Sequence, residues 1–256
     1  MSDLLVLCYH GISADWPDDT AVTPEAFAAQ VESLVARGYR GATLTEALTA
    51  PRHPKTLVVT FDDAATSVDE HARPVLDRLG LPGTVFVPTD LPDGGRPMAW
   101  DGLAQWLGGP HEHELACIGW DRLRELAAAG WEIGSHSRSH PRLTTLGDQR
   151  LRDELVGSKA ELERRLEAPC HSIAYPYSDV DARVARAARD AGYGVGVTVP
   201  LEPTPSLPLL WSRVGVYRGD TARRVWLRAR RRAYGLSPTG RAVDAALAGG
   251  LRLVRR

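Results

Sequence analysis

Hydrophobic residues in this chain occur in short runs that alternate with longer amphipathic stretches. Short apolar runs between turn residues are typical of buried strands, whereas apolar residues spaced three and four apart are typical of helices. The predicted strands cover residues 4–9, 57–61, 83–88, 131–135, 172–175 and 193–199. The predicted helices cover residues 24–37, 68–79, 120–129, 180–191 and part of 146–167.

Several predicted helix ends carry recognisable boundary residues. Thr23 can cap the helix that begins at Pro24, and glycines follow four of the helices (Gly38, Gly80, Gly130 and Gly192). Repeated strand–helix units imply a parallel sheet. About seven units predict an α/β fold of the (β/α) barrel type, complete or incomplete.

Polar clusters lie directly after several of the predicted strands. Catalytic residues of such barrels gather at the carboxyl ends of the strands, so we expect these clusters to meet at one rim. They are Tyr9-His10, Asp62-Asp63, His136 and Tyr175-Pro176-Tyr177.

Composition indicates an ordinary globular protein of 256 residues, with 43% hydrophobic and 25% charged residues. Cys8, Cys117 and Cys170 are odd in number and widely separated, which argues against a disulfide framework and for a reducing compartment. The first apolar run lacks a preceding basic region, so we interpret it as a strand, not a signal peptide. We therefore expect a cytoplasmic protein.

Charge is distributed unevenly along the chain. From residue 213 onwards twelve arginines face two aspartates, so this end carries about +10 and the preceding part about −11. We predict a barrel domain over residues 1–219 and an Arg-rich helical extension over 220–256. Trp226 among arginines is typical of a helix on an anionic membrane, here the inner face. The alternative is a solvated helix that packs on the acidic barrel. Nucleic-acid binding is not expected, because no recognition fold accompanies the charge.

Two motifs carry most of the chemistry. Asp62 and Asp63 are adjacent, and side chains of neighbouring residues in an extended segment point to opposite sides. One of them can therefore bind a metal while the other faces an attacking water. His136 and His140 have the spacing of ligands on one face of a helical turn. An Asp-Asp pair alone is more often a turn or a cap, but two imidazoles and a carboxylate suit a divalent metal with open positions.

Three strings resemble a known family: T-F-D-D at residues 60–63, G-S-H-S-R-S-H-P at 134–141 and A-Y-P-Y at 174–177. They are similar to motifs of the polysaccharide deacetylases of carbohydrate esterase family 4, the NodB-homology enzymes. The resemblance covers roughly residues 4–217 and implies a distorted (β/α)7-type barrel. It also implies a divalent metal, with zinc first and cobalt, nickel or manganese as alternatives, and Asp63, His136 and His140 as its ligands. Asp62 resembles the family's general base.

Two positions depart from the common family pattern. Ala174 stands where many members have an arginine that positions the base, and no histidine follows His171 to supply the usual general acid. The opening string Cys8-Tyr9-His10-Gly11-Ile12 resembles the first strand of the permuted poly-N-acetylglucosamine deacetylases, where that strand supplies the acid. His10 is therefore our candidate acid, and Arg213 is our candidate for the missing arginine. The alternatives are structural roles for both residues.

The remaining substrate-binding predictions concern the segment from Tyr175 to Tyr177 and the tryptophans. We expect the backbone N–H of Tyr177 to stabilise an oxyanion, with Tyr175 and Pro176 in the same substrate-contacting segment. Four tryptophans are candidates for stacking on sugars, although most should be packing residues: Trp100, Trp106, Trp120 and Trp211.

The sequence thus predicts a metal-dependent hydrolase that removes an N-acetyl or other N-acyl group from an amino sugar of a glycan. One alternative is a deacylase or deformylase of a small lipid-linked or nucleotide-linked sugar or secondary metabolite. Another is a catalytically silent barrel that binds glycans.

Overall fold

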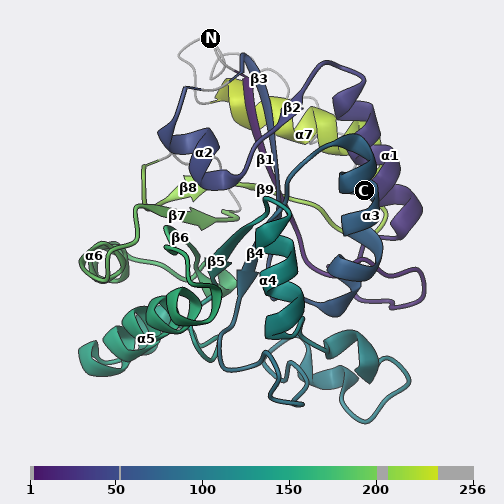
Figure 1. The fold of residues 1–256 in the computed structure, drawn as a ribbon. Coiled ribbons are helices and arrows are strands. Elements are labelled where there is room, and N and C mark those ends of the chain that lie inside the picture. Colours follow the sequence, from purple (N-terminus) through teal and green to yellow (C-terminus); the bar gives the residue numbers. More distant parts are fainter. Residues whose placement is uncertain (1–2, 52, 201–206, 236–256) are drawn as a thin grey trace, which may run out of the picture.

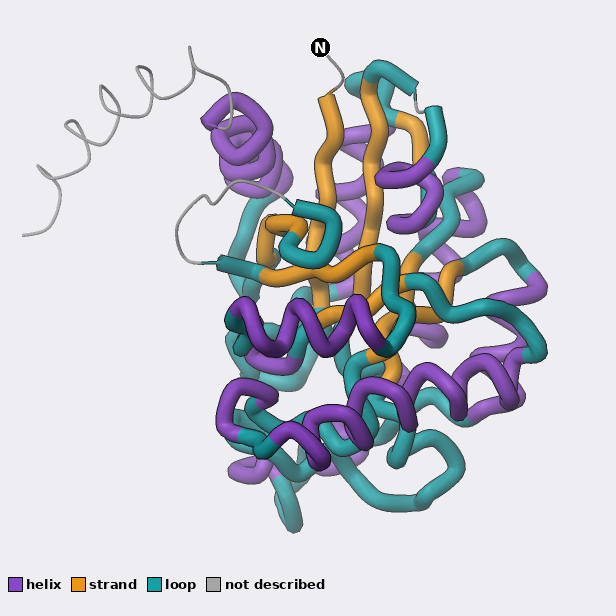
Figure 2. Tube along the Cα trace, turned by 90° about the vertical axis from the view of Figure 1, so that its left-hand side faces the viewer, coloured by secondary structure: helices purple, strands orange, loops and turns teal. Residues whose placement is uncertain are grey.

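The computed structural model describes residues 3–51, 53–200 and 207–235, and its strands form a parallel sheet curled into a barrel (Figures 1 and 2). The sheet order is β8-β7-β6-β5-β4-β3-β1-β9, and β2 pairs with the first part of β3. The strands are β1 (Asp3–Tyr9), β2 (Arg40–Gly41), β3 (Lys55–Phe61), β4 (Thr84–Val87), β5 (Glu132–Ser135), β6 (Ser172–Ala174), β7 (Val195–Thr198), β8 (Trp211–Ser212) and β9 (Val214–Gly215).

One short segment nearly closes the barrel. β8 pairs with β7 at one edge of the sheet, and β9 pairs with β1 at the other edge. Only Arg213 separates these two strands, and its backbone N–H donates to the carbonyl of Thr198 at 2.8 Å. The same stretch of chain therefore satisfies backbone groups at both open edges, which confirms the predicted α/β barrel.

Helices surround the barrel, with α5 and α6 on one side and α1 and α3 on the other (Figure 1). The α-helices are α1 (Pro24–Val35), α2 (Leu44–Thr49), α3 (Arg73–Leu79), α4 (Trp120–Ala128), α5 (Asp148–Leu166), α6 (Ala182–Asp190) and α7 (Ala222–Gly235). A π-helical turn (Val68–Ala72) precedes α3, and four 3-10 turns lie at Ala104–Trp106, Glu112–Leu115, Leu143–Thr145 and Pro176–Ser178.

Local boundary signals act as the sequence predicts. The side chain of Thr23 accepts a hydrogen bond from the N–H of Ala26 and caps α1. Gly80 ends α3 in the left-handed conformation, with a φ of 65°. The single helix predicted over residues 68–79 begins instead with the π-helical turn, and α2, β2, β8 and β9 escaped the sequence analysis because each is very short.

A separate, smaller hydrophobic cluster lies above the barrel. It joins the loops after β1 and β3 to the long connection between β4 and α4, and consists of Trp16, Ala21, Ala65, Met98, Leu103 and Leu115. Two hydrogen bonds reinforce this contact, from Ser13 to Glu114 and from the Trp106 indole to Asp18. The long connection thus covers one side of the barrel mouth.

The described part of the basic extension packs on the barrel. Val225 and Ala229 of α7 are fully buried, and α7 contacts α1, β1 and β9. The guanidinium groups of Arg37 and Arg230 each lie over the Trp226 ring, at 5.2 and 5.1 Å from its centroid. No helix in the described ranges is both long enough and apolar enough to cross a bilayer. Residues 236–256 lie outside the described part, and the domain boundary at residue 219 stays a prediction.

Candidate active site

The carboxyl ends of the strands bring the predicted polar residues into one cleft of about 350 Å³. The cleft is lined by eight of the residues that the sequence singled out: His10, Asp62, Asp63, Trp100, His136, His140, Tyr175 and Tyr177. Further lining residues had not been identified from the sequence, namely Asp18, Asp101 and Tyr217. Pro176 is buried beside the cleft, and Arg213 lies beneath its floor, behind Asp62.

Three of these residues form a group with metal-ligand geometry. Asp63 Oδ1 lies 3.3 Å from His136 Nε2 and 3.4 Å from His140 Nε2. A tetrahedral ion with bonds of about 2.0–2.1 Å would hold its ligand atoms about 3.3–3.4 Å apart. Asp63 Oδ1 is buried and lacks a hydrogen bond of standard geometry. Two imidazole nitrogens and one otherwise unpartnered carboxylate oxygen therefore fit a zinc-type divalent cation.

Metal binding at this group depends on the protonation of its three side chains. His136 Nδ1 donates to the carbonyl of Ala174 at 2.8 Å, which assigns the proton to Nδ1 and leaves the Nε2 lone pair facing Asp63. Burial lowers the pKa of His140 to about 3, so its imidazole is neutral at ordinary pH. Burial alone would raise the pKa of Asp63, but contact with the two histidines outweighs it and lowers that pKa. Burial would lower the pKa of His136, but contact with Asp63 and Asp62 outweighs it and raises that pKa, so metal binding at this group would displace a proton from His136.

The backbone that presents the histidines differs from the prediction. Residues 136–142 form no helical turn. Ser137 and His140 each have a φ of 61°, in the left-handed region that residues other than glycine rarely adopt. The prediction that His136 and His140 share one face of a helical turn is therefore wrong. An irregular loop brings their rings to 4.8 Å between centroids instead.

Asp62 is held by Arg213 in a bidentate ion pair. Arg213 Nη1 donates to Asp62 Oδ1 at 2.7 Å and Nη2 donates to Oδ2 at 2.6 Å, while Nη1 also contacts Thr60 Oγ1 at 2.9 Å. Burial would raise the pKa of Asp62, but the guanidinium outweighs burial and holds that pKa below its usual value. The segment that closes the barrel thus places an arginine against Asp62. Ala174, which stands where the motif of the resembling family has an arginine, carries no charge.

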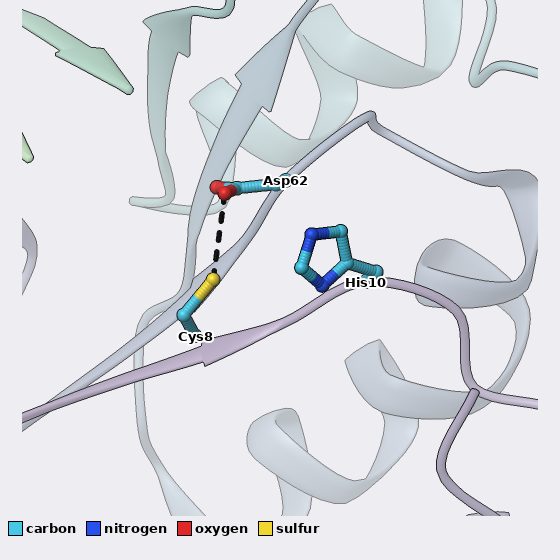
Figure 3. A group of neighbouring side chains, drawn as sticks. All are labelled: Cys8, His10 and Asp62. Atoms are coloured by element: carbon cyan, nitrogen blue, oxygen red, sulfur yellow. Dashed lines mark hydrogen bonds between the residues drawn. The ribbon is translucent and has the colours of Figure 1, made fainter. Parts of the chain in front are cut away.

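His10 and Cys8 complete the surroundings of Asp62 (Figure 3). The His10 ring lies beside the carboxylate, and the Cys8 thiol donates to Asp62 Oδ2 at 3.4 Å. One ligand-type atom from each of the three residues lies within 4.8 Å of the others. A cation there would face the Arg213 guanidinium, which already contacts both oxygens, so we assign no metal to this group. The contact between Cys8 and Asp62 could not be predicted, because a single buried thiol on a strand has no distinguishing pattern.

The segment after β6 turns sharply into the cleft. Tyr177 and Ser178 have positive φ values of 58° and 56°, and the Tyr177 ring contacts the His140 ring at 4.7 Å. Within the described chain no hydrogen bond involves the backbone N–H of Tyr177, so it is available as a donor. Tyr175 is only 1% exposed and its hydroxyl lies against Gly196, where an added Cβ would come within 2.7 Å.

The tryptophans divide between the rim and the core. Trp100 lines the cleft and stacks on His140, with ring centroids 3.9 Å apart and an interplanar angle of 17°. Trp120 is buried in the main core. Trp106 packs edge-on against Trp16. Of the four candidates, Trp100 is the one at the cleft.

Comparison with known proteins identifies the family. Residues 49–196 match the family model described as polysaccharide deacetylase. Over 200 residues the chain is 29% identical to the putative polysaccharide deacetylase YxkH of Bacillus subtilis. The matched region covers 76% of this chain and 64% of that protein. The chain thus spans slightly less than two thirds of the length of this curated relative.

Solved structures show the same fold. The Streptococcus pyogenes deacetylase PplD, in complex with acetate, gives a TM-score of 0.75 at 20% identity and covers 88% of this chain and 97% of its own. IcaB from Ammonifex degensii gives 0.70 at 25% identity and covers 90% and 98%. The family model alone spans more than half of the sequence, and this chain belongs to the polysaccharide deacetylase family.

Proposed function

We propose that this protein is a metal-dependent hydrolase that removes the N-acetyl group from an amino sugar of a glycan. The observation that carries the proposal is the Asp63–His136–His140 group, in which the carboxylate oxygen already lies at tetrahedral spacing from both imidazole nitrogens. Beside it in the same cleft lie an ionised carboxylate, Asp62, and an imidazole, His10. Family membership supports an acetylated glycan as the substrate.

Asp63, His136 and His140 would hold the metal. A bound divalent cation would polarise the acyl carbonyl and make a water molecule more acidic. The donor set fits zinc and is compatible with cobalt, nickel or manganese.

Asp62 serves as the general base in this proposal. Its Oδ2 accepts hydrogen bonds from Arg213 and Cys8, whereas among the described residues its Oδ1 accepts from Arg213 alone. A carboxylate oxygen has two lone pairs, so Oδ1 retains one that can accept the proton of the attacking water. The ion pair with Arg213 keeps the carboxylate ionised and fixes its orientation.

His10 serves as the general acid. An amine is a poor leaving group, so the amide nitrogen must receive a proton as the C–N bond breaks. The His10 ring reaches the cleft, and its Nδ1 is buried without a hydrogen-bond partner in the described chain. The backbone N–H of Tyr177 donates to the oxyanion that forms on the carbonyl oxygen.

A substrate panel tests this function. The metal-loaded protein is incubated with N-acetylglucosamine oligomers, with a lipid-linked N-acetylated sugar and with a nucleotide-linked one, and free amine and acetate are quantified. We expect equal amounts of amine and acetate from the oligomers, and none from the Asp62→Asn variant. Turnover of only the lipid-linked or nucleotide-linked sugar would show that the substrate is a small sugar conjugate and not a glycan. Bound metal with no product from any substrate would contradict the proposal and favour a glycan-binding barrel.

We also propose that the outer face of α7 contacts anionic membrane at the cytoplasmic side. Arg223, Arg224 and Arg231 are exposed on this helix, and Leu227 between them is 45% exposed. Arginines around an apolar residue suit anionic headgroups. Co-sedimentation with phosphatidylserine vesicles at low salt tests the contact. We expect binding that neutral vesicles do not give, and equal recovery from both would contradict it.

A further inference from the structure

The loop between β5 and the 3-10 turn at Leu143–Thr145 carries both candidate histidine ligands in an unfavourable backbone conformation. Two of its residues, Ser137 and His140, adopt left-handed φ values without being glycine. Such a conformation persists only where surrounding groups impose it. The contacts that hold this loop therefore determine the relative positions of the His136 and His140 imidazoles.

The first half of the loop is tied to neighbouring strands and to the connection after β4. Ser135 Oγ accepts from the Ser137 N–H at 3.1 Å. The N–H groups of Thr89 and Asp90 donate to the carbonyls of Ser137 and Arg138, at 3.2 and 3.0 Å. These bonds fix the chain close to His136. Within the loop, the His140 N–H donates to Ser137 Oγ at 3.2 Å, which leaves Arg138 and Ser139 to be held from outside.

The middle of the loop is held by Glu154 from the middle of α5. Glu154 is 1% exposed, and its Oε2 accepts from the backbone N–H groups of Arg138 and Ser139, each at 2.9 Å. Its Oε1 accepts from Ser139 Oγ at 2.7 Å. Arg150 lies 2.9 Å from the same oxygen and balances the charge. One buried carboxylate thus binds three donors from the two residues that lie midway between the histidines.

We propose that Glu154 is a positioning residue for the metal group. By holding the N–H groups of Arg138 and Ser139, it imposes the left-handed turn at His140 and sets the position of that imidazole relative to His136. It touches neither the metal nor the substrate. The inference rests on the proposed metal dependence, and it predicts that metal affinity depends on a helix residue outside the cleft.

Glu154→Ala tests the role, with Leu155→Ala as the matched control. Leu155 is the next residue of α5 and is fully buried, so its truncation destabilises the same helix while leaving the loop contacts intact. The dissociation constant for Zn²⁺ is measured by competition with a chromophoric chelator. Thermal unfolding of the metal-free proteins is measured in parallel.

We expect Glu154→Ala to weaken Zn²⁺ binding by about 10–100-fold, the range found for residues that orient metal ligands, and Leu155→Ala to change it by less than about threefold. Both variants should unfold at lower temperature than the unchanged protein. Glu154→Gln should lose less affinity than Glu154→Ala, because its amide oxygen can accept both backbone N–H groups and its NH₂ can donate to Ser139 Oγ.

Two results would overturn the inference. One is a Glu154→Ala protein that binds Zn²⁺ as tightly as the unchanged protein. The other is an equal loss of affinity in Leu155→Ala, which would show that helix stability alone is responsible. The absence of Zn²⁺ binding by the unchanged protein would refute the metal dependence itself, and so is distinct from both.

Discussion

Replacing Arg213 by Met removes the cation that faces Asp62 while keeping an apolar side chain of similar length. The two charged groups are almost completely buried, with side-chain exposures of 1% for Arg213 and 6% for Asp62. The substitution leaves the Asp62 carboxylate in a site where burial is the largest influence on its pKa and raises it. The carboxylate then has no charged partner directly bonded to it.

Breaking a buried pair by removing one partner costs about 3–5 kcal/mol. At 1.36 kcal/mol per unit, this corresponds to a rise of roughly 2–4 units in the pKa of Asp62. In the unchanged protein this pKa lies below its unfolded value, so the ion pair stabilises the fold fully above about pH 4 and less as pH falls through the folded pKa. In Arg213→Met the folded pKa moves up to the range of the unfolded one, so this stabilisation is lost. Its stability deficit should therefore be largest at neutral pH and shrink as pH falls.

Urea unfolding at pH 7 and at pH 5, together with the pH dependence of kcat/KM, measures these effects. We expect Arg213→Met to lose about 3–5 kcal/mol at pH 7, and the acidic limb of its rate profile to move to higher pH. The double variant Arg213→Met with Asp62→Asn should recover part of the stability, because no charge remains buried.

Arg78→Met is the matched control. Arg78 pairs with Glu32 at 2.7 Å, about as closely as Arg213 with Asp62, but the two side chains are 58% and 45% exposed. Its loss should cost no more than about 1 kcal/mol. The reasoning is refuted if Arg213→Met is no less stable than Arg78→Met and its rate profile keeps the same acidic limb.

Three further substitutions have defined outcomes. Asp62→Asn should lower kcat by about 10²–10⁴-fold and retain metal in equilibrium dialysis; loss of metal would reverse our roles for the two aspartates. His10→Asn should lower kcat over a similar range while metal binding is retained, and an unchanged kcat would exclude His10 as the acid. Gly134→Ala would place a Cβ 2.6 Å from Phe86, so it should cost about 1–3 kcal/mol in denaturant unfolding, and an unshifted midpoint would contradict this close packing.

The sequence predicted the barrel and the place of its site because both depend on local signals. Apolar runs mark the strands, and Asp62-Asp63 and His136 follow directly where strands β3 and β5 end. Parallel strands put their carboxyl ends at one edge, so their mutual approach follows from topology alone. The family motifs then suggested a different role for each aspartate.

Other features depend on contacts between distant parts of the chain. Arg213 reaches Asp62 because a single segment, with two residues on either side of Arg213, pairs with both edges of the sheet. Strands of two residues have no periodicity that could reveal them. Glu154 lies in an ordinary polar helix, and its contacts with the loop at Ser139 appear only once α5 packs beside β5. The spacing of His136 and His140 suggested a helical turn, but tertiary contacts impose a loop.

Metal titration with a simultaneous activity measurement tests the central claim most directly. The protein is stripped of metal with a chelator and titrated with Zn²⁺ while acetate release from N-acetylglucosamine oligomers is followed. The arrangement of Asp63, His136 and His140 around one position predicts no activity in the stripped protein. Activity should then rise in proportion to added Zn²⁺ and level off at one ion per chain. Full acetate release by protein shown to be free of metal would contradict the account.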